Sequence, residues 1–116
     1  MPTDRPKLPV FFYRTRRGTE PVRAWLKSLP AAERRVIGLD LDRVQKQWPV
    51  GMPLCRSLGS GLWELRSNLP GNRIIRLMFF VEDDEIYVLH GFIKKTQKTP
   101  DDEIDLARRR LKETKE

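Results

Sequence analysis

The stretch Leu89-His-Gly-Phe-Ile-Lys-Lys-Thr-Gln-Lys-Thr-Pro100 decides how the chain is organised. It runs from an apolar strand, through three lysines, to the last helix, and it contains the chain's single histidine. Thr99, Pro100 and the acids that follow predict a helix start, since hydroxyl caps, N-terminal prolines and first-turn carboxylates all favour one. We therefore expect the upstream residues to present a basic sheet surface here, and the downstream helix to close it.

Hydrophobic periodicity predicts seven elements in the order β-α-α-β-β-β-α. Pro30 separates the two central helices, and Pro and Gly punctuate a long loop before the later strands. The expected strands cover residues 10–15, 62–66, 73–81 and 85–93; the expected helices cover 19–29 and 31–48, and the last begins at 99. Because short connections make neighbouring strands antiparallel, we expect an α+β fold with helices packed on one face of a small sheet.

Composition points to one basic domain spanning residues 1–116, with residues 1–8 as a flexible arm. Lys and Arg outnumber Asp and Glu by 23 to 16, a formal net charge of +7. Such a surplus on a small domain favours an acidic partner, and the alternative is a solubilising surface charge. The single cysteine excludes an internal disulfide, and no signal-peptide pattern or membrane-length apolar run is visible, so we expect a cytoplasmic protein.

Side-chain alternation along the strands predicts a distinctive open face. Trp63 and Leu65 should point toward the helices, leaving Arg66 on the other side. In the next strand, the side chains on one face are all apolar and those on the other are mixed, and we expect the mixed face to be exposed to solvent. Strand 85–93 is apolar on both parities, so it should lie inside the sheet, and alternation leaves open whether the His90 set or the Tyr87 set faces the helices. The open face should gather Arg66, Arg73, Arg76, Met78 and Phe80, with lysines from the following loop.

Cations mixed with apolar side chains suit single-stranded RNA, because guanidinium groups bind phosphate and apolar groups hold unstacked bases. Metal-free cleavage by an attacking 2′-OH would need fixed cations at the phosphoryl oxygens and a group that moves protons. The candidate catalytic residues are Arg66, Arg73, His90, Lys94 and Lys95, and the candidate RNA-binding residues are Arg76, Phe80 and Lys98. The alternative is a solvated basic face with a half-buried structural histidine.

The sequence contains no residue motif typical of other catalytic or cofactor-binding sites. There is no HExxH motif, no paired cysteine and no glycine-rich phosphate loop, so we expect neither a metal nor a cofactor. Cys55 has no nearby histidine motif, and we expect it to be inert.

Several of these strings occur together in a known family. Leu62-Trp-Glu-Leu-Arg66, the strand that starts with Arg73-Ile-Ile-Arg76, the stretch ending at Pro100, and Glu103-Ile-x-x-Ala107 resemble the phage-derived, HigB-like branch of the RelE toxin superfamily. The resemblance covers about residues 8–113. It implies a RelE-like fold and a type II toxin that enters the ribosomal A site and cleaves mRNA without metal. It also implies an antitoxin partner with a helix-turn-helix domain, through which the complex represses its own operon.

Carried over by position, Arg66 and Arg73 match phosphate-contacting positions of the family, and Lys94 and Lys95 match the basic end of the last strand. The chain departs from the family pattern at Glu64, where RelE has a basic residue. A late tyrosine of RelE also has no counterpart in the last helix. Some HigB proteins use histidines, and this chain offers only His90.

Three alternatives remain open at this stage. The same scaffold serves ParE-like poisons of DNA gyrase, which lack an RNase site. A non-enzymatic basic module that binds nucleic acid is a second alternative, and a toxin that has lost its activity is a third.

Overall fold

The computed structural model describes residues 6–94 and 99–116. Its helices are α1 (Pro21–Ser28), α2 (Ala31–Gln47) and α3 (Asp101–Lys115). Its strands are β1 (Val10–Phe12), β2 (Cys55–Gly59), β3 (Leu62–Leu69), β4 (Arg73–Glu82) and β5 (Glu85–Lys94). The predicted elements are all present, although β1 is shorter than expected and the N-cap position of α1 is Glu20, without a side-chain cap bond, rather than Thr19.

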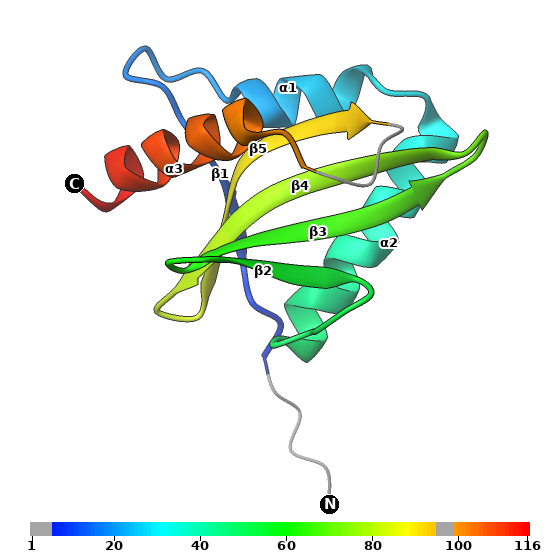
Figure 1. Ribbon diagram of the computed structural model, residues 1–116, viewed down its shortest axis with the longest axis horizontal. Coiled ribbons are helices and arrows are strands. Elements are labelled where there is room, and N and C mark those ends of the chain that lie inside the picture. The colour runs from blue at the N-terminus through cyan, green and yellow to red at the C-terminus, as the bar shows by residue number, and fades with distance from the viewer. Residues whose placement is uncertain (1–5, 95–98) are drawn as a thin grey trace, which may run out of the picture.

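The five strands form one sheet in the order β1-β5-β4-β3-β2 (Figure 1). β1 runs parallel to β5, and every other neighbouring pair is antiparallel. The α+β class is therefore confirmed, and strand 85–93 lies inside the sheet as expected. β2 was expected to be loop, but it pairs with β3 through a turn of Gly59, Ser60 and Gly61 that has positive φ angles.

One face of the sheet is covered by α1 and α2. Ile75, Leu77 and Phe79 of β4 pack there with the predicted helix stripe of Ile37, Leu41, Val44 and Trp48. α1 approaches β5 so closely that a Cβ added at Gly91 would lie 2.7 Å from both Trp25 and Leu77. Only glycine fits at this contact, which fixes the height of α1 above the sheet.

The opposite face is covered by α3, so our expectation that all helices share one face is wrong for this element (Figure 1). Met78 and Phe80 alternate along β4 with Leu77 and Phe79 of the first core. They form a second core with Leu62, Leu89 and Ala107. Both were expected on an open surface, but neither side chain is more than 2% exposed. The physical reason is that α1 and α2 already occupy the first face, while this face still offers enough apolar area to hold a helix.

A β-bulge in β5 settles which side chains face α3. The pairing moves from Phe79 opposite Val88 to Met78 opposite His90, so Leu89 is the extra residue. Val88 packs in the core under α1 and α2, whereas Leu89 packs under α3. His90 lies opposite Met78 and so joins the α3 face. Strict alternation separates Tyr87 from His90, and the bulge brings both onto that face.

The N-terminal segment is fixed at its end. Leu8 is 5% exposed, its N–H donates to the Gln45 carbonyl at 3.0 Å, and its own carbonyl accepts from Gln45 Nε2 at 2.7 Å. The prediction of a flexible arm is therefore wrong at Leu8, and residues 1–5 lie outside the described residues. Of the described helices, none combines the length and apolar character that a membrane crossing would require.

Candidate nucleic-acid interface

Arg66 and Arg76 are directly opposite each other on β3 and β4, on the face that α3 partly covers. The structure thus brings these two predicted residues together. The row continues to Phe92 of β5, and the neighbouring row is Glu64, Met78 and His90. Arg66 and His90 therefore come from adjacent rows of one face, two strands apart, or about 10 Å between backbones.

Arg76 is buried, and its charge is met by side chains rather than by solvent. Its guanidinium donates to Thr99 Oγ1 at 2.5 Å, and Thr99 in turn donates to Glu64 Oε2 at 2.5 Å. Arg76 and Glu64 are both 0% exposed, and the Arg76 Nη1 to Glu64 Oε1 distance is 3.8 Å. Loss of solvent lowers the pKa of Arg76, and the Glu64 carboxylate opposes that shift. An arginine in this position cannot reach RNA, which corrects the prediction of Arg76 as an RNA-binding residue.

This network explains the chain's departure from the family pattern at Glu64. The carboxylate lies beneath Arg76 and is also 3.8 Å from Arg66 Nε. A buried cation needs a counter-ion because an unpaired charge in the interior costs several kcal/mol, on the order of 3–5 when one partner is removed. Glu64 thus supplies the charge that lets Arg76 be buried.

Arg66 is a partly exposed cation of this face. Its side chain is 22% exposed, and Arg56 lies beside it, opposite Glu64 on β2. Both guanidinium groups lower the pKa of Arg76, after the larger effect of burial, so positive charge from Arg56 and Arg66 acts on the buried Arg76–Glu64 pair. The β2–β3 side of the face is therefore the more positive side.

His90 is held by the first turn of α3. Its Nε2 lies 3.0 Å from Glu103 Oε2, and its ring stacks on Phe92 with 5.8 Å between centroids. A carboxylate on one ring nitrogen fixes the orientation of the imidazole. Beside this pair is a hollow of about 380 Å³ lined by Phe92, Ile93, Pro100, Asp102 and Glu103. The hollow places an aromatic ring next to a held histidine.

Arg73 lies on the opposite face from Arg66. It is opposite Leu69 in the register, and its Nη1 contacts Glu33 of α2 at 2.7 Å. The expectation that Arg73 stands at the mouth of the arginine face is therefore wrong, because the first residue of β4 has the same parity as Ile75 and Leu77. The side chain is still 40% exposed.

The remaining predicted residues divide into two groups. Phe80 is 2% exposed and stacks on Tyr87 beneath α3, so its prediction as an RNA-binding residue is wrong for this conformation. Lys94 is the last residue of β5 and lies opposite Ile74. Lys95 and Lys98 lie outside the described residues.

Cys55 has the chemistry of a buried, inert thiol. It lies at the start of β2 and is 1% exposed. Burial raises the pKa of its thiol to about 11, so almost no thiolate is present near neutral pH.

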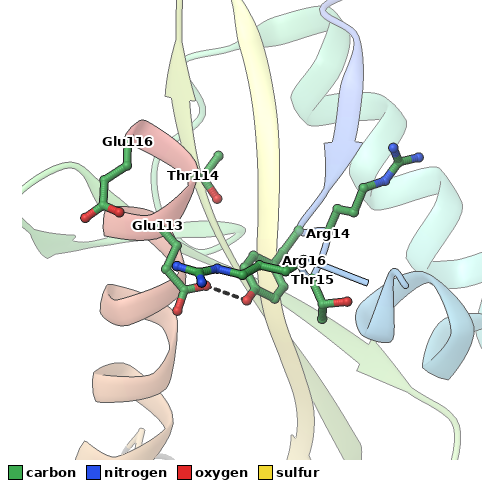
Figure 2. Close-up of a pocket in the computed structure, with 7 residues that line it drawn as sticks. Arg14, Thr15, Arg16, Glu113, Thr114 and Glu116 are labelled. Atoms are coloured by element: carbon green, nitrogen blue, oxygen red, sulfur yellow. Dashed lines mark hydrogen bonds between the residues drawn. The ribbon is translucent and has the colours of Figure 1, made fainter. Parts of the chain in front are cut away.

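The C-terminal end of α3 is held against the sheet by a second polar cluster (Figure 2). Tyr13 donates to Glu113 Oε2 at 2.5 Å, and this hydrogen bond raises the pKa of Tyr13. Arg110 lies over the Tyr13 ring at 4.7 Å and donates to the Leu89 carbonyl at 2.9 Å. A hollow lies between Arg14, Arg16 and the end of α3, and it is lined by both arginines and glutamates. We interpret its charged side chains as contacts that hold α3 on the sheet, and not as a ligand site.

Sequence reasoning missed three side chains that build this face: Glu64, Thr99 and Glu103. Thr99 was expected to cap α3, but the cap position is Pro100 and no side-chain cap bond is present. The available signals were a carboxylate in β3, at Glu64, and an acid in the first turn of α3, at Glu103. Neither identifies its partner without the tertiary structure. Within residues 6–94 and 99–116, no group of three or more His, Cys, Asp or Glu side chains is placed as metal ligands would be.

The fold and its charged face define a small RelE-like α+β protein. Residues 24–112 match the family described as phage-derived protein Gp49-like (DUF891), and the chain belongs to that family. In general terms this is a family of RelE/HigB-like toxins, which is consistent at a coarse level with a toxin of a toxin–antitoxin pair. No curated protein matches the chain.

Proposed function

We propose that this protein is the toxin of a type II toxin–antitoxin pair and that it cleaves mRNA on the ribosome without a metal ion. The observation that carries the proposal is the placement of accessible Arg66 and of the His90–Glu103 pair on one face of the sheet. The family membership and the net charge of +7 support it. The cognate antitoxin, the ribosome and mRNA are the proposed partners.

In the proposed reaction, the 2′-OH of one nucleotide attacks the adjacent phosphorus and the 5′-oxygen leaves. Negative charge grows on the phosphoryl oxygens in the transition state, and a fixed guanidinium stabilises it there more than in the ground state. Arg66 has this role. The buried Glu64–Thr99–Arg76 network holds the strands beneath it, so the guanidinium is positioned before RNA arrives.

His90 has the role of moving a proton between the 2′-OH and the 5′-oxygen, because an imidazole can accept a proton at one ring nitrogen and donate one from the other. Glu103 is a positioning residue that orients the ring. Phe92 offers a partly exposed ring on which a base can stack. Lys94 and Lys95 stay candidates for the same reaction on the family resemblance.

Charge distribution sets the direction of the RNA backbone. The first turn of α3 carries Asp101, Asp102 and Glu103, which repel phosphate, whereas Arg56 and Arg66 attract it. We therefore place the scissile phosphate on the β2–β3 side of His90 and the base toward Phe92.

The test is induced expression in a bacterial host, with 5′ ends of mRNA mapped in growing cells. New ends inside translated codons that disappear when translation is blocked are the expected result. Growth arrest without new ends would overturn the proposal in favour of a gyrase poison. Soluble protein that causes no arrest would overturn it in favour of a binding module or an inactive toxin.

A further inference from the structure

The hollow of about 380 Å³ between the end of β5 and the start of α3 is lined by two kinds of side chain. Its apolar lining residues are Phe92, Ile93 and Pro100, and its acidic lining residues are Asp102 and Glu103. Its volume lies within the range of about 300–1,000 Å³ typical of sites for small ligands. The hollow therefore has room for one ring system, with apolar groups to pack against it and carboxylates to meet its edge.

Phe92 supplies an aromatic surface to this hollow. The ring is partly exposed, and it stacks on the His90 imidazole with 5.8 Å between the centroids and 28° between the planes. Bases of single-stranded RNA stack on aromatic side chains, because every base has a π-face. A base that packs against Phe92 thus lies beside the same ring that contacts the proposed proton-transfer residue.

The charges at the hollow select against phosphate. Among the described residues that line it, Asp102 and Glu103 are acidic and none is a lysine or an arginine, although the whole chain carries a net charge of +7. An anionic phosphate is repelled here and attracted by Arg56 and Arg66 on the β2–β3 side of the face. The chemistry that fits the hollow is therefore a neutral ring with hydrogen-bond donors on its edge.

Asp102 is the carboxylate at the hollow that can accept such donors with both oxygens. It is exposed, and it forms no ion pair with a described cation. Glu103, in contrast, already has its Oε2 at 3.0 Å from His90 Nε2. Because an ionised carboxylate only accepts hydrogen bonds, Asp102 distinguishes ligands by the donors that they present.

We propose that this hollow reads one base of the RNA substrate and that it selects guanine. Guanine presents two adjacent donors, N1–H and the N2 amino group, which match the two oxygens of one carboxylate. Adenine and cytosine present one amino donor beside an accepting ring nitrogen, and uracil presents one N–H between two carbonyls, so each leaves one carboxylate oxygen facing an acceptor. The inference rests on the proposed function for its substrate, and it adds Asp102 as a specificity-determining residue with Phe92 as its stacking surface.

The first test measures binding without cleavage. The full-length, isotope-labelled chain is titrated with short RNAs that carry 2′-O-methyl groups, so that no 2′-OH can attack, and that contain a single guanine or a single adenine among uracils. We expect the guanine RNA to shift the amide resonances of Phe92, Asp102 and Glu103, and to bind at least about fivefold more tightly than the adenine RNA, the lower end for one bidentate base contact. Equal affinities, or shifts confined to another surface, would overturn the inference whether or not the protein cleaves mRNA.

The second test reads the base at the cut sites when mRNA 5′ ends are mapped in growing cells. We expect cut sites of the parent to be enriched in guanine at one fixed position beside the cut. Asp102→Asn should lower that enrichment by about fivefold or more and favour adenine, with which an amide pairs. Asp105→Asn removes the same charge from α3 outside the hollow and should keep the guanine enrichment.

The enrichment is a ratio among cut sites, so it does not depend on how much mRNA each variant cleaves. The same base distribution in Asp102→Asn and Asp105→Asn would overturn the base-reading role of Asp102 and leave mRNA cleavage in place. An absence of cuts in the parent would instead overturn the proposed function, and the affinities for the guanine and adenine RNAs would then decide the inference.

Discussion

The two faces of the sheet differ in what holds them together. Under α1 and α2 the core is made of apolar side chains such as Ile75, Leu77 and Phe79. Under α3 an apolar cluster lies next to a charged network of Glu64, Thr99 and Arg76. The first face is held mainly by buried apolar area, with one ion pair, Arg73 with Glu33, whose arginine is 40% exposed. The second face also requires each charge of a fully buried pair to have its partner in place.

This difference teaches how a small basic domain can carry a charged face on a stable scaffold. Burial of apolar side chains is favourable and does not depend on direction, so it stabilises the fold even when side chains move slightly. A buried ion pair adds little net stability but penalises the loss of either partner, so it fixes positions. The face with proposed chemistry is the one that uses the second device.

Removing a large side chain from the apolar face should have the largest effect. Phe79 is fully buried and packs edge-on against Trp48 at 5.4 Å. We expect Phe79→Ala to destabilise the fold by about 3–5 kcal/mol, measured by denaturant unfolding. Phe11→Ala, at a residue 44% exposed, is the control and should have a much smaller effect. Equal losses for the two variants would show that the apolar face is not the main source of stability.

Breaking the ion pair on the other face should come next. Arg76→Met leaves Glu64 buried without one of the two cations that lie 3.8 Å from it, at an expected cost of about 3 kcal/mol. We place it at the low end because Arg66 is also 3.8 Å from Glu64. Adding Glu64→Gln should recover most of the loss, since no charge then remains buried. A double variant that is less stable than Arg76→Met would contradict this account.

Removing the bridge alone should have a smaller effect. Thr99→Val keeps the shape of the side chain but removes the hydroxyl between Arg76 and Glu64. The expected loss is about 1.5–2 kcal/mol, at the low end for hydrogen bonds to charged groups. Thr19→Val is a matched control on the exposed α1 side. If the two variants have the same melting temperature, the hydrogen bonds of Thr99 to Arg76 and Glu64 do not contribute to stability.

The smallest expected effect is a gain on the apolar side. Gly38→Ala should stabilise the free chain by about 0.5–1 kcal/mol, because alanine is the better helix former and its Cβ meets nothing within 4 Å. Thermal unfolding of the variant and parent side by side measures it. A loss of stability would mean that α2 requires glycine for a reason within the chain.

Most of the fold could be predicted from local pattern. Helix α2 follows from its stripe of Ile37, Leu41 and Val44, and β4 follows from its alternation. β2 could not, because a five-residue strand between prolines and glycines has the composition of a loop. The side of the sheet chosen by α3 depends on which face is still uncovered, and this information is not local.

The candidate site was less predictable than the fold for the same reason. Alternation correctly put Arg66 and Arg76 on one face, but whether that face was open depended on α3. The bulge at Leu89 reversed the parity of β5, so no alternating pattern could place His90. Arg73 was grouped with Arg66 by its charge, whereas its parity put it beside Glu33.

The most direct test of the account compares Arg66→Gln with Arg73→Gln in the mapping of mRNA 5′ ends, with antitoxin-free expression adjusted to equal protein levels. Both variants remove one partly exposed guanidinium from the same strand pair, but from opposite faces of the sheet. We expect Arg66→Gln to reduce cleavage by about 10²–10³-fold, as for loss of one transition-state donor, and Arg73→Gln to cleave nearly as the parent does. Cleavage retained by Arg66→Gln and lost in a folded Arg73→Gln would contradict the account and move the site to the face of α1 and α2.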